Sequence, residues 1–186
     1  MIIKTIWHNS HHWRFRELPP HLRTWLLDHT SLTQRLQRLC GEAIQVEVLT
    51  QGWQRPLLTE GQRLGLPFTQ YARIRQVYLC CQQQPWVFAR TVIPNTTLAG
   101  EHRRLAQLGR HPLGSVLFAH PSLQRSEFQI ACLHPKQPLY LLATTPLNLP
   151  PPSCLWGRRS IFYLAQKPLL VSEIFLPNLM TSLLSK

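Results

Sequence analysis

The chain has 186 residues, of which 44% are hydrophobic, and a formal net charge of +12. This length and composition predict one folded domain and exclude an intrinsically disordered chain. Since no apolar stretch reaches the roughly 18 residues of a membrane span and the first residues lack the pattern of a secretory signal, we expect a cytoplasmic protein with no membrane span.

The positive charge is compatible with an anionic partner of any size. The arginines are scattered singly or in pairs such as Arg158-Arg159, and the chain has no basic run, zinc finger or RNA-binding signature. These are the features that a nucleic-acid-binding domain typically carries. We therefore expect no nucleic-acid partner.

The five cysteines are odd in number and lack Cys-x-x-Cys spacing. Zinc sites typically combine cysteines and histidines two to four residues apart, so we expect no metal site. Isolated cysteines of this kind are typical of reduced, mostly buried thiols. We expect this state for all five residues, which are Cys40, Cys80, Cys81, Cys132 and Cys154.

Two helices are predicted near the start of the chain. An apolar stripe over residues 22–27 indicates the first helix. A second stripe, over residues 32–39, follows Thr30 or Ser31 as the N-cap and is followed by Gly41, a residue suited to a helix end. We therefore expect an early helical layer.

The remaining segments predict mainly strands, with apolar residues recurring at residues 43–50, 71–81, 86–93, 128–133, 139–143, 155–165 and 169–176. Residues 82–85 are a hairpin connection between the second and third of these. A helix is expected at residues 97–109 and a short apolar piece at 113–118. Residues 51–70 indicate a long loop and residues 145–152 a proline-rich loop.

Successive strands with short connections favour an antiparallel sheet, here of about six strands. Helices grouped early and in the middle of the chain favour the α+β class over alternating α/β units. We therefore predict one compact α+β domain spanning residues 1–186.

Three charged residues interrupt apolar rows, a row being the residues on one face of a predicted strand. Glu173 shares its row with Val171 and Phe175. Arg75 shares its row with Val77 and Leu79, and Arg90 shares its row with Phe88 and Val92. Burying an ionised side chain without partners is very costly. These charges therefore pair internally, face solvent, or form a site. The site interpretation is a pocket with two arginines and one carboxylate, which suits a small dicarboxylate because arginine binds carboxylates through two hydrogen bonds.

Other catalytic motifs are missing from the sequence. We find no Gly-x-Ser-x-Gly, no phosphate-binding loop and no Gly-x-Gly-x-x-Gly before a helix. Asp28 is the single aspartate, and its place in a helical pattern argues against a Ser–His–Asp triad.

Four motifs, in this order, resemble the chorismate lyase (chorismate–pyruvate lyase) family of ubiquinone biosynthesis; they are Arg-Thr-Val-Ile-Pro at 90–94, Leu-Gly-Arg-His-Pro-Leu-Gly at 108–114, Leu-Trp-Gly-Arg-Arg-Ser at 155–160, and the run at 167–177. Each motif alone is weak, but together they extend the resemblance over about residues 14–178. It implies an antiparallel sheet with helices covering an enclosed ligand pocket. Residues 133–153 look like an insertion relative to that family.

The resemblance also implies a function, the conversion of chorismate to 4-hydroxybenzoate and pyruvate, which is the first committed step of ubiquinone biosynthesis. No metal or organic cofactor is expected, and the protein is expected to be a monomer. Catalytic roles fall on Glu173 and Arg90, and substrate binding on Arg75 and Glu173, with backbone contacts at Leu113 and Leu32. Leu32 stands where methionine is common in the family.

Two questions stay open at this point. Glu173 either delivers a proton to the leaving group or binds the ring hydroxyl, and the lid is either the 51–70 loop or the helix near Leu32. The alternative function is a non-catalytic, small-anion-binding domain of the same fold, as in the effector-sensing domains of certain bacterial repressors. Such domains normally follow a DNA-binding domain, and too few residues precede the first helix here for one.

Overall fold

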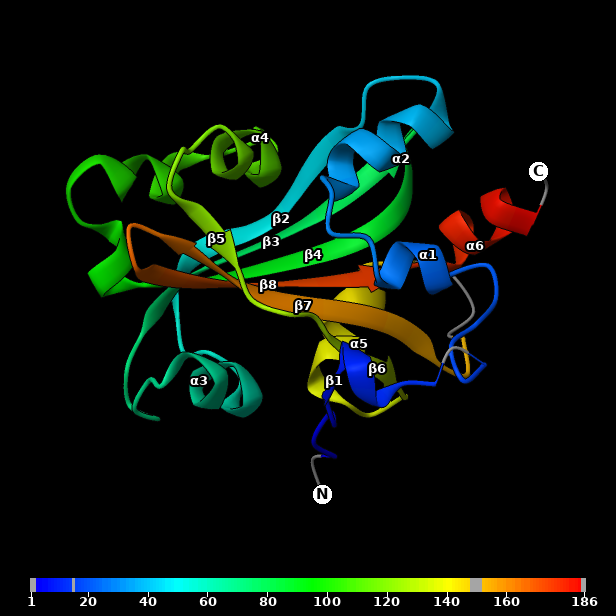
Figure 1. Ribbon diagram of the computed structural model, residues 1–186, viewed down its shortest axis with the longest axis horizontal. Helices are drawn as coiled ribbons and strands as arrows, with labels where there is room; N and C mark the ends of the chain where they lie inside the picture. Colours follow the sequence, from blue (N-terminus) through cyan, green and yellow to red (C-terminus); the bar gives the residue numbers. More distant parts are fainter. Residues whose placement is uncertain (1–2, 15, 148–151, 185–186) are drawn as a thin grey trace.

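The computed structural model describes residues 3–14, 16–147 and 152–184. Within them the frame is one eight-stranded antiparallel sheet (Figure 1). Its main path runs in the order β1-β6-β7-β8-β4-β3-β2, and β5 also pairs with β7. The strands are β1 (His8–Asn9), β2 (Gln45–Gln54), β3 (Ala72–Cys81), β4 (Gln84–Pro94), β5 (Leu123–Arg125), β6 (Gln129–Leu133), β7 (Leu155–Leu164) and β8 (Lys167–Phe175).

The predicted α+β class and antiparallel sheet are confirmed, and the sheet has eight strands where about six were expected. The two extra strands, β1 and β5, are two and three residues long. A strand this short contains too few residues to show an alternating pattern. The hairpin predicted between β3 and β4 is present and turns at Gln82 and Gln83, both with positive φ.

Helices cover both faces of the sheet (Figure 1). We call the face under α1 (Arg23–Leu26), α2 (Leu32–Cys40) and α4 (Leu113–Phe118) the upper face. The lower face carries α3 (Leu58–Leu64) and α5 (Pro138–Thr144), while α6 (Pro177–Leu184) ends the described chain. Three short 3₁₀ segments complete the fold, at Ser10–His12, Asn95–Leu98 and Gly100–Gln107.

The two predicted early helices are confirmed. Helix α2 follows Ser31, whose side chain accepts a hydrogen bond from the Gln34 amide, and it ends at Gly41 with φ of 80°. That left-handed conformation is the one that glycine adopts at little cost. The N-cap and the C-terminal glycine therefore define this helix as the sequence predicted.

Three other segments differ from the predictions. Residues 51–70 hold the end of β2 and helix α3, and residues 97–109 form 3₁₀ segments in place of a regular helix. Residues 139–143, expected as a strand, lie in helix α5, and the short apolar piece at residues 113–118 forms helix α4. Short apolar runs do not distinguish a strand from a buried helix by periodicity. Residues 148–151 of the predicted proline-rich loop lie outside the described residues.

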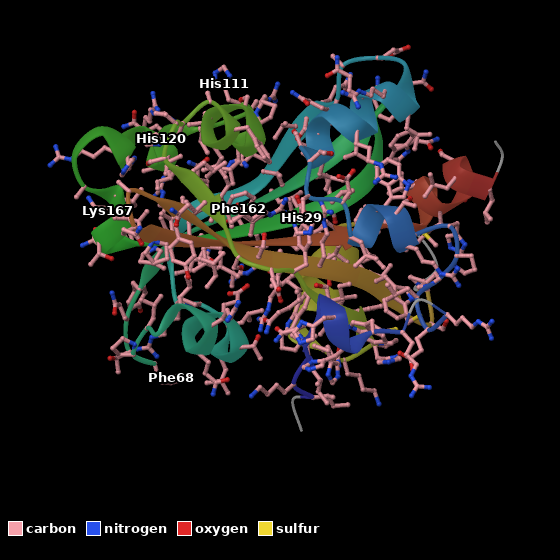
Figure 2. The ribbon with its side chains drawn as sticks, in the orientation of Figure 1. His29, Phe68, His111, His120, Phe162 and Lys167 are labelled. Atoms are coloured by element: carbon pink, nitrogen blue, oxygen red, sulfur yellow. A yellow bond between two sulfur atoms is a disulfide. The ribbon has the colours of Figure 1, made fainter. Side chains whose placement is uncertain are left out.

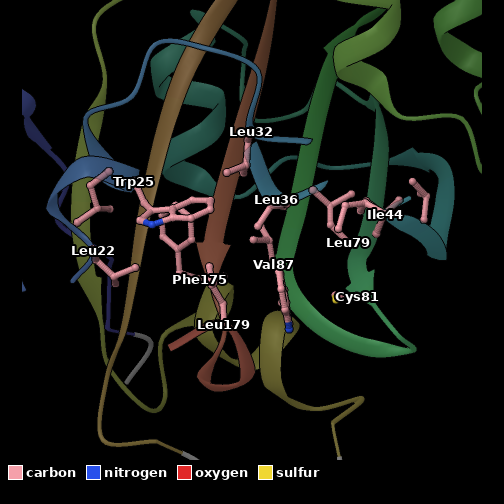
Figure 3. Packing of buried hydrophobic residues seen from close by; sticks show 14 of the residues in the cluster. Leu22, Trp25, Leu32, Leu36, Ile44, Leu79, Cys81, Val87, Phe175 and Leu179 are labelled. Atoms are coloured by element: carbon pink, nitrogen blue, oxygen red, sulfur yellow. The ribbon is translucent and has the colours of Figure 1, made fainter. Parts of the chain in front are cut away.

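Both faces of the sheet are buried. The upper core joins α1 and α2 to the strands through residues such as Trp25, Leu36 and Phe175 (Figure 3). The lower core packs Tyr78 and Phe88 against α5. An apolar row in a strand therefore does not reveal which face it occupies.

A disulfide joins Cys40, the last residue of α2, to Cys81, the last residue of β3, with the Cα atoms 5.8 Å apart. The expectation that all five cysteines are reduced is therefore wrong. Cys81 lies on the upper face, where α2 packs, and this packing brings together two residues 41 apart in sequence.

Within the described residues, none of the helices has the length and apolar character needed to cross a membrane.

Candidate active site

The expected pocket lies on the upper face, beneath the starts of α2 and α4. It is a cavity of about 50 Å³ whose lining includes four of the five expected site residues, namely Arg75, Glu173, Leu32 and Leu113. This volume is well below the roughly 300–1,000 Å³ of typical ligand pockets. The pocket as it stands is therefore too small for a typical ligand and must widen to hold one.

Strand register explains why Arg75 and Glu173 share this pocket. Arg75 of β3 pairs with Thr91 of β4, while Glu173 of β8 pairs with Ala89 of the same strand. Residues two apart on a strand point to the same face, so both charged side chains rise from the upper face. The small side chains of Ala89 and Thr91 lie between them and line the pocket.

Arg75 is held by the chain segment that precedes α4. Its Nη2 donates to the carbonyl oxygens of Gly109 at 2.9 Å and His111 at 3.0 Å. Its Nε is buried and finds no acceptor within the described residues. Burial lowers the pKa of Arg75 to about 10, which leaves the guanidinium charged at neutral pH. It can therefore donate to an anion in the pocket.

Glu173 is paired with an arginine that the sequence interpretation did not single out. Its Oε2 accepts from the Nε of Arg158 at 2.6 Å, and Arg158 is fully buried. The Nη1 of Arg158 also donates to the carbonyl oxygens of Trp25 and Asp28, each at 2.6 Å. Among the described residues, none hydrogen-bonds to Oε1 of Glu173, so this oxygen can accept a hydrogen bond from a ligand.

A further arginine, Arg125 of β5, completes the charged lining. Its Nη2 lies 3.8 Å from Oε2 of Glu173 and its Nε donates to Ser160. Its guanidinium carbon lies 4.1 Å and 4.5 Å from the ring centres of Phe128 and Phe162, the latter labelled in Figure 2. Burial lowers the pKa of Arg125 to about 10. Sequence reasoning missed this residue because β5 is three residues long and shows no pattern.

Arg90 does not line this pocket, contrary to the expectation of two arginines from β3 and β4 on one face. It lies on the lower face, where its Nε and Nη2 donate to the two carboxylate oxygens of Glu60 at 2.7 Å and 3.0 Å. Both side chains are at most 3% exposed. The row of Arg90 is apolar because it faces the lower core. Since both faces of the sheet are covered, an apolar row alone could not show that Arg90 and Arg75 lie on opposite faces.

The starts of α2 and α4 meet above the pocket. A Cβ atom placed on Gly114 would lie 3.6 Å from Oγ of Ser31, so the two helix starts lie close together. The first amides of a helix have no partner within the helix, and they carry partial positive charge. Leu32 and Leu113, the first residues of α2 and α4, therefore offer backbone donors at the pocket lining.

Asp28 and Arg35 hold the segment before α2 in place. Arg35 Nη1 donates to Oδ2 of Asp28 at 2.7 Å and to the carbonyl oxygen of Thr24 at 2.6 Å. Oδ1 of Asp28 accepts from the amide of Thr30, a pocket residue.

Within the described residues, no group of three or more His, Cys, Asp or Glu side chains is placed to hold a metal ion.

These features define an α+β protein with a small, arginine-lined pocket on one face of an antiparallel sheet. The family model for chorismate lyase matches residues 1–184, and the chain belongs to this family. A probable chorismate pyruvate-lyase of Nitrosomonas eutropha is 38% identical over 159 residues, which cover 86% of this chain and 88% of the relative. One from Marinobacter nauticus is 40% identical over 166 residues, covering 86% and 78%.

The solved structure of PhnF from Mycobacterium smegmatis has the same fold, with a TM-score of 0.58 at 9% identity. The match covers 82% of this chain and 66% of that one. At this identity the likeness concerns the fold alone.

Proposed function

We propose that this protein is a chorismate lyase that converts chorismate to 4-hydroxybenzoate and pyruvate without a cofactor, as the first committed step of ubiquinone biosynthesis in the cytoplasm. The observation that carries the proposal is that Arg75 and Glu173 line one small pocket, in a chain that belongs to the chorismate lyase family. The same pocket holds Arg125. Two cationic side chains beside one carboxylate suit a substrate with two carboxylates.

The reaction requires little covalent chemistry from the protein. The ether bond between ring and enolpyruvyl group breaks, the ring loses a proton and becomes aromatic, and the released enolpyruvate takes up a proton to give pyruvate. Positioning the dianion and stabilising charge on the departing oxygen then supply most of the rate enhancement. In this scheme Arg75 holds one carboxylate, together with the first amides of α2 and α4, and Arg125 binds the enolpyruvyl carboxylate.

Glu173 is assigned to the ring hydroxyl in this proposal. Its Oε2 accepts from Arg158 at 2.6 Å, and that bond fixes the orientation of the carboxylate. Oε1 is then free to accept a hydrogen bond from the ring hydroxyl of the ligand. Arg90 takes no part in the proposed chemistry, since its guanidinium is occupied by Glu60 on the lower face.

The lid in this proposal consists of the starts of α2 and α4, with Leu32 and Leu113 at their tips. These segments meet over a cavity of about 50 Å³, so they must separate for substrate to enter and product to leave. The alternative lid, residues 51–70, contains α3, which covers the lower face (Figure 1). Such opening steps are often slower than the chemistry.

The direct test is to incubate the purified protein with chorismate and to follow the absorbance band of 4-hydroxybenzoate. We expect product formation by the wild type and its loss in Arg75→Ala. A matched control is Arg73→Ala, because Arg73 lies two residues away on the same face of β3 without lining the pocket. A wild-type protein that binds 4-hydroxybenzoate but does not turn over chorismate would instead support the non-catalytic, anion-binding alternative.

A further inference from the structure

A row of polar residues crosses the lower face of the sheet at one register level. It is formed by neighbours on six strands, in the order Thr50, Gln76, Arg90, Ser172, Arg159 and Gln129 from β2 to β6. Four of these residues (Gln76, Arg90, Ser172 and Arg159) are buried. Burying polar groups is unfavourable unless they are fully hydrogen-bonded. A purely structural face would be expected to be apolar at this level, as it is on either side.

A cavity of about 380 Å³ lies against this row. We call it the lower pocket; it is lined by Trp7 of the N-terminal segment, Leu57, Leu58 and Glu60 at α3, Leu139 of α5, and Arg159 and Ser172 of the sheet. Its volume falls within the range of small-molecule pockets. The sheet separates it from the candidate active site, which lies on the upper face. Helix α5, part of its wall, belongs to the segment expected to be an insertion.

Arg159 is the polar centre of the lower pocket. Its Nε donates to Gln129 at 2.9 Å and its Nη1 to the carbonyl oxygen of Thr59 at 3.2 Å, and its guanidinium carbon lies 4.5 Å from the ring centre of Trp7. The described residues provide no acceptor for its Nη2. A guanidinium has five N–H donors in a fixed geometry, so Arg159 keeps donors for a ligand.

The charge around Arg159 is unbalanced. Glu60 is the acidic residue of the lower pocket, and both of its oxygens are bound by Arg90. Lys4 also lines the lower pocket. Burial and then the charge of Arg63 lower the pKa of Arg159, and the charge of Glu60 offsets them only in part, so that the pKa is about 9. A cationic side chain that is buried in this way is stabilised by an anion, and an anion with an apolar body would also cover the leucine and tryptophan surface.

We propose that the lower pocket is a second binding site, for a small organic monoanion with an apolar body such as an aromatic carboxylate. The carboxylate lies against Nη2 of Arg159 and the hydroxyl of Ser172. The body lies between Trp7, Leu58 and Leu139. This site neither contains nor requires any residue of the proposed chemistry on the upper face.

The test uses 4-fluorobenzoate as the probe, observed by ¹⁹F NMR titration of the full chain. Because this probe also resembles a ligand of the upper pocket, the titration is made in Arg75→Ala, which weakens that site. We expect saturable binding of one probe per chain in this variant. Arg159→Met in the same background should weaken it at least about tenfold, as should replacing the probe with uncharged 4-fluorobenzamide.

A second pair of variants guards against a folding defect in Arg159→Met. Leu58 is 53% exposed at the edge of the lower pocket, so its replacement should leave the fold intact. Adding Leu58→Glu to Arg75→Ala should weaken 4-fluorobenzoate binding about threefold at low salt through charge repulsion, whereas the isosteric Leu58→Gln should not. Loss of all binding in Arg75→Ala, or equal affinities for the Glu and Gln variants, would overturn the second site. Chorismate turnover by the wild type tests the proposed function separately.

Discussion

Glu173 and Arg158 are paired residues on adjacent strands, and their side chains form a 2.6 Å hydrogen bond beside the pocket. The same guanidinium reaches the carbonyl oxygens of Trp25 and Asp28. Arg158 therefore connects the pocket carboxylate to the segment that leads into α2. A change at Glu173 should affect both the ligand site and the cover above it.

Glu173→Gln is expected to lower kcat for chorismate about a hundredfold, because a neutral amide accepts a hydrogen bond from the ring hydroxyl much less strongly than a carboxylate does. The variant also leaves Arg158 buried without its carboxylate, which should cost about 3–5 kcal/mol of unfolding free energy. Denaturant unfolding should therefore accompany the initial-rate measurement, so that rates are compared per folded molecule. Near-normal turnover in a folded Glu173→Gln protein would refute the assigned role.

Arg90 is expected to contribute to stability and not to catalysis. Arg90→Met leaves Glu60 buried and unpaired, and should lower the unfolding free energy by about 3–5 kcal/mol. The double variant Arg90→Met/Glu60→Leu removes both charges, and should recover most of that loss because paired charges gain little over apolar packing. Chemical denaturation and turnover per folded molecule check both points. If the double variant folds but has no activity, Arg90 is catalytic after all, as the sequence had suggested.

The Cys40–Cys81 disulfide is expected to stabilise the fold by closing a chain segment between residues 41 apart. The chain-entropy relation gives about 4 kcal/mol for a loop of this length. Unfolding by denaturant should therefore shift by about this amount when reductant is added to the wild type. Cys40→Ala should start from the lower value and respond little to reductant, and equal stability of the wild type in both conditions would contradict the prediction.

Four of the five residues named from the sequence line one pocket, and the reasoning that led to them also explains where Arg90 was misplaced. A charge in an apolar row drew attention to Arg75 and Glu173, because burying a charge requires partners or a function, and the structure brings both into one pocket. The same reasoning placed Arg90 in their pocket, although a sheet covered on both faces has two apolar sides. Neighbours on a strand also point to opposite faces, so that Arg158 serves the upper pocket and Arg159 the lower one.

Other features depend on contacts between segments far apart in sequence. Arg125 comes from a three-residue strand with no pattern, and the disulfide arises because α2 packs beside the end of β3. Helix α5 was mistaken for a strand, since Leu139 and its apolar neighbours fit either structure. No local pattern reports these arrangements, because tertiary packing determines them.

Asp28, which holds the segment before α2, makes the stability of the fold depend on pH. Burial raises the pKa of its carboxyl group. Hydrogen bonds from Thr30 and the nearby guanidinium of Arg35 together lower it by more than burial raises it, so that the pKa lies below its ordinary value of 3.8. A carboxyl group with a lower pKa in the folded state stabilises the fold above its unfolded pKa. That contribution is lost as the pH falls below about 4 and through the folded pKa.

Asp28→Asn should therefore reduce the unfolding free energy by up to about 1 kcal/mol at pH 7, and the difference from the wild type should shrink as the pH falls below 4. Unfolding curves of both proteins at neutral and acid pH measure it. Glu42→Gln, at an exposed residue away from the pocket, is the matched control and should show little difference at either pH. A deficit of Asp28→Asn that stays constant down to pH 2 would show that the ionised carboxylate is not what holds this segment in place.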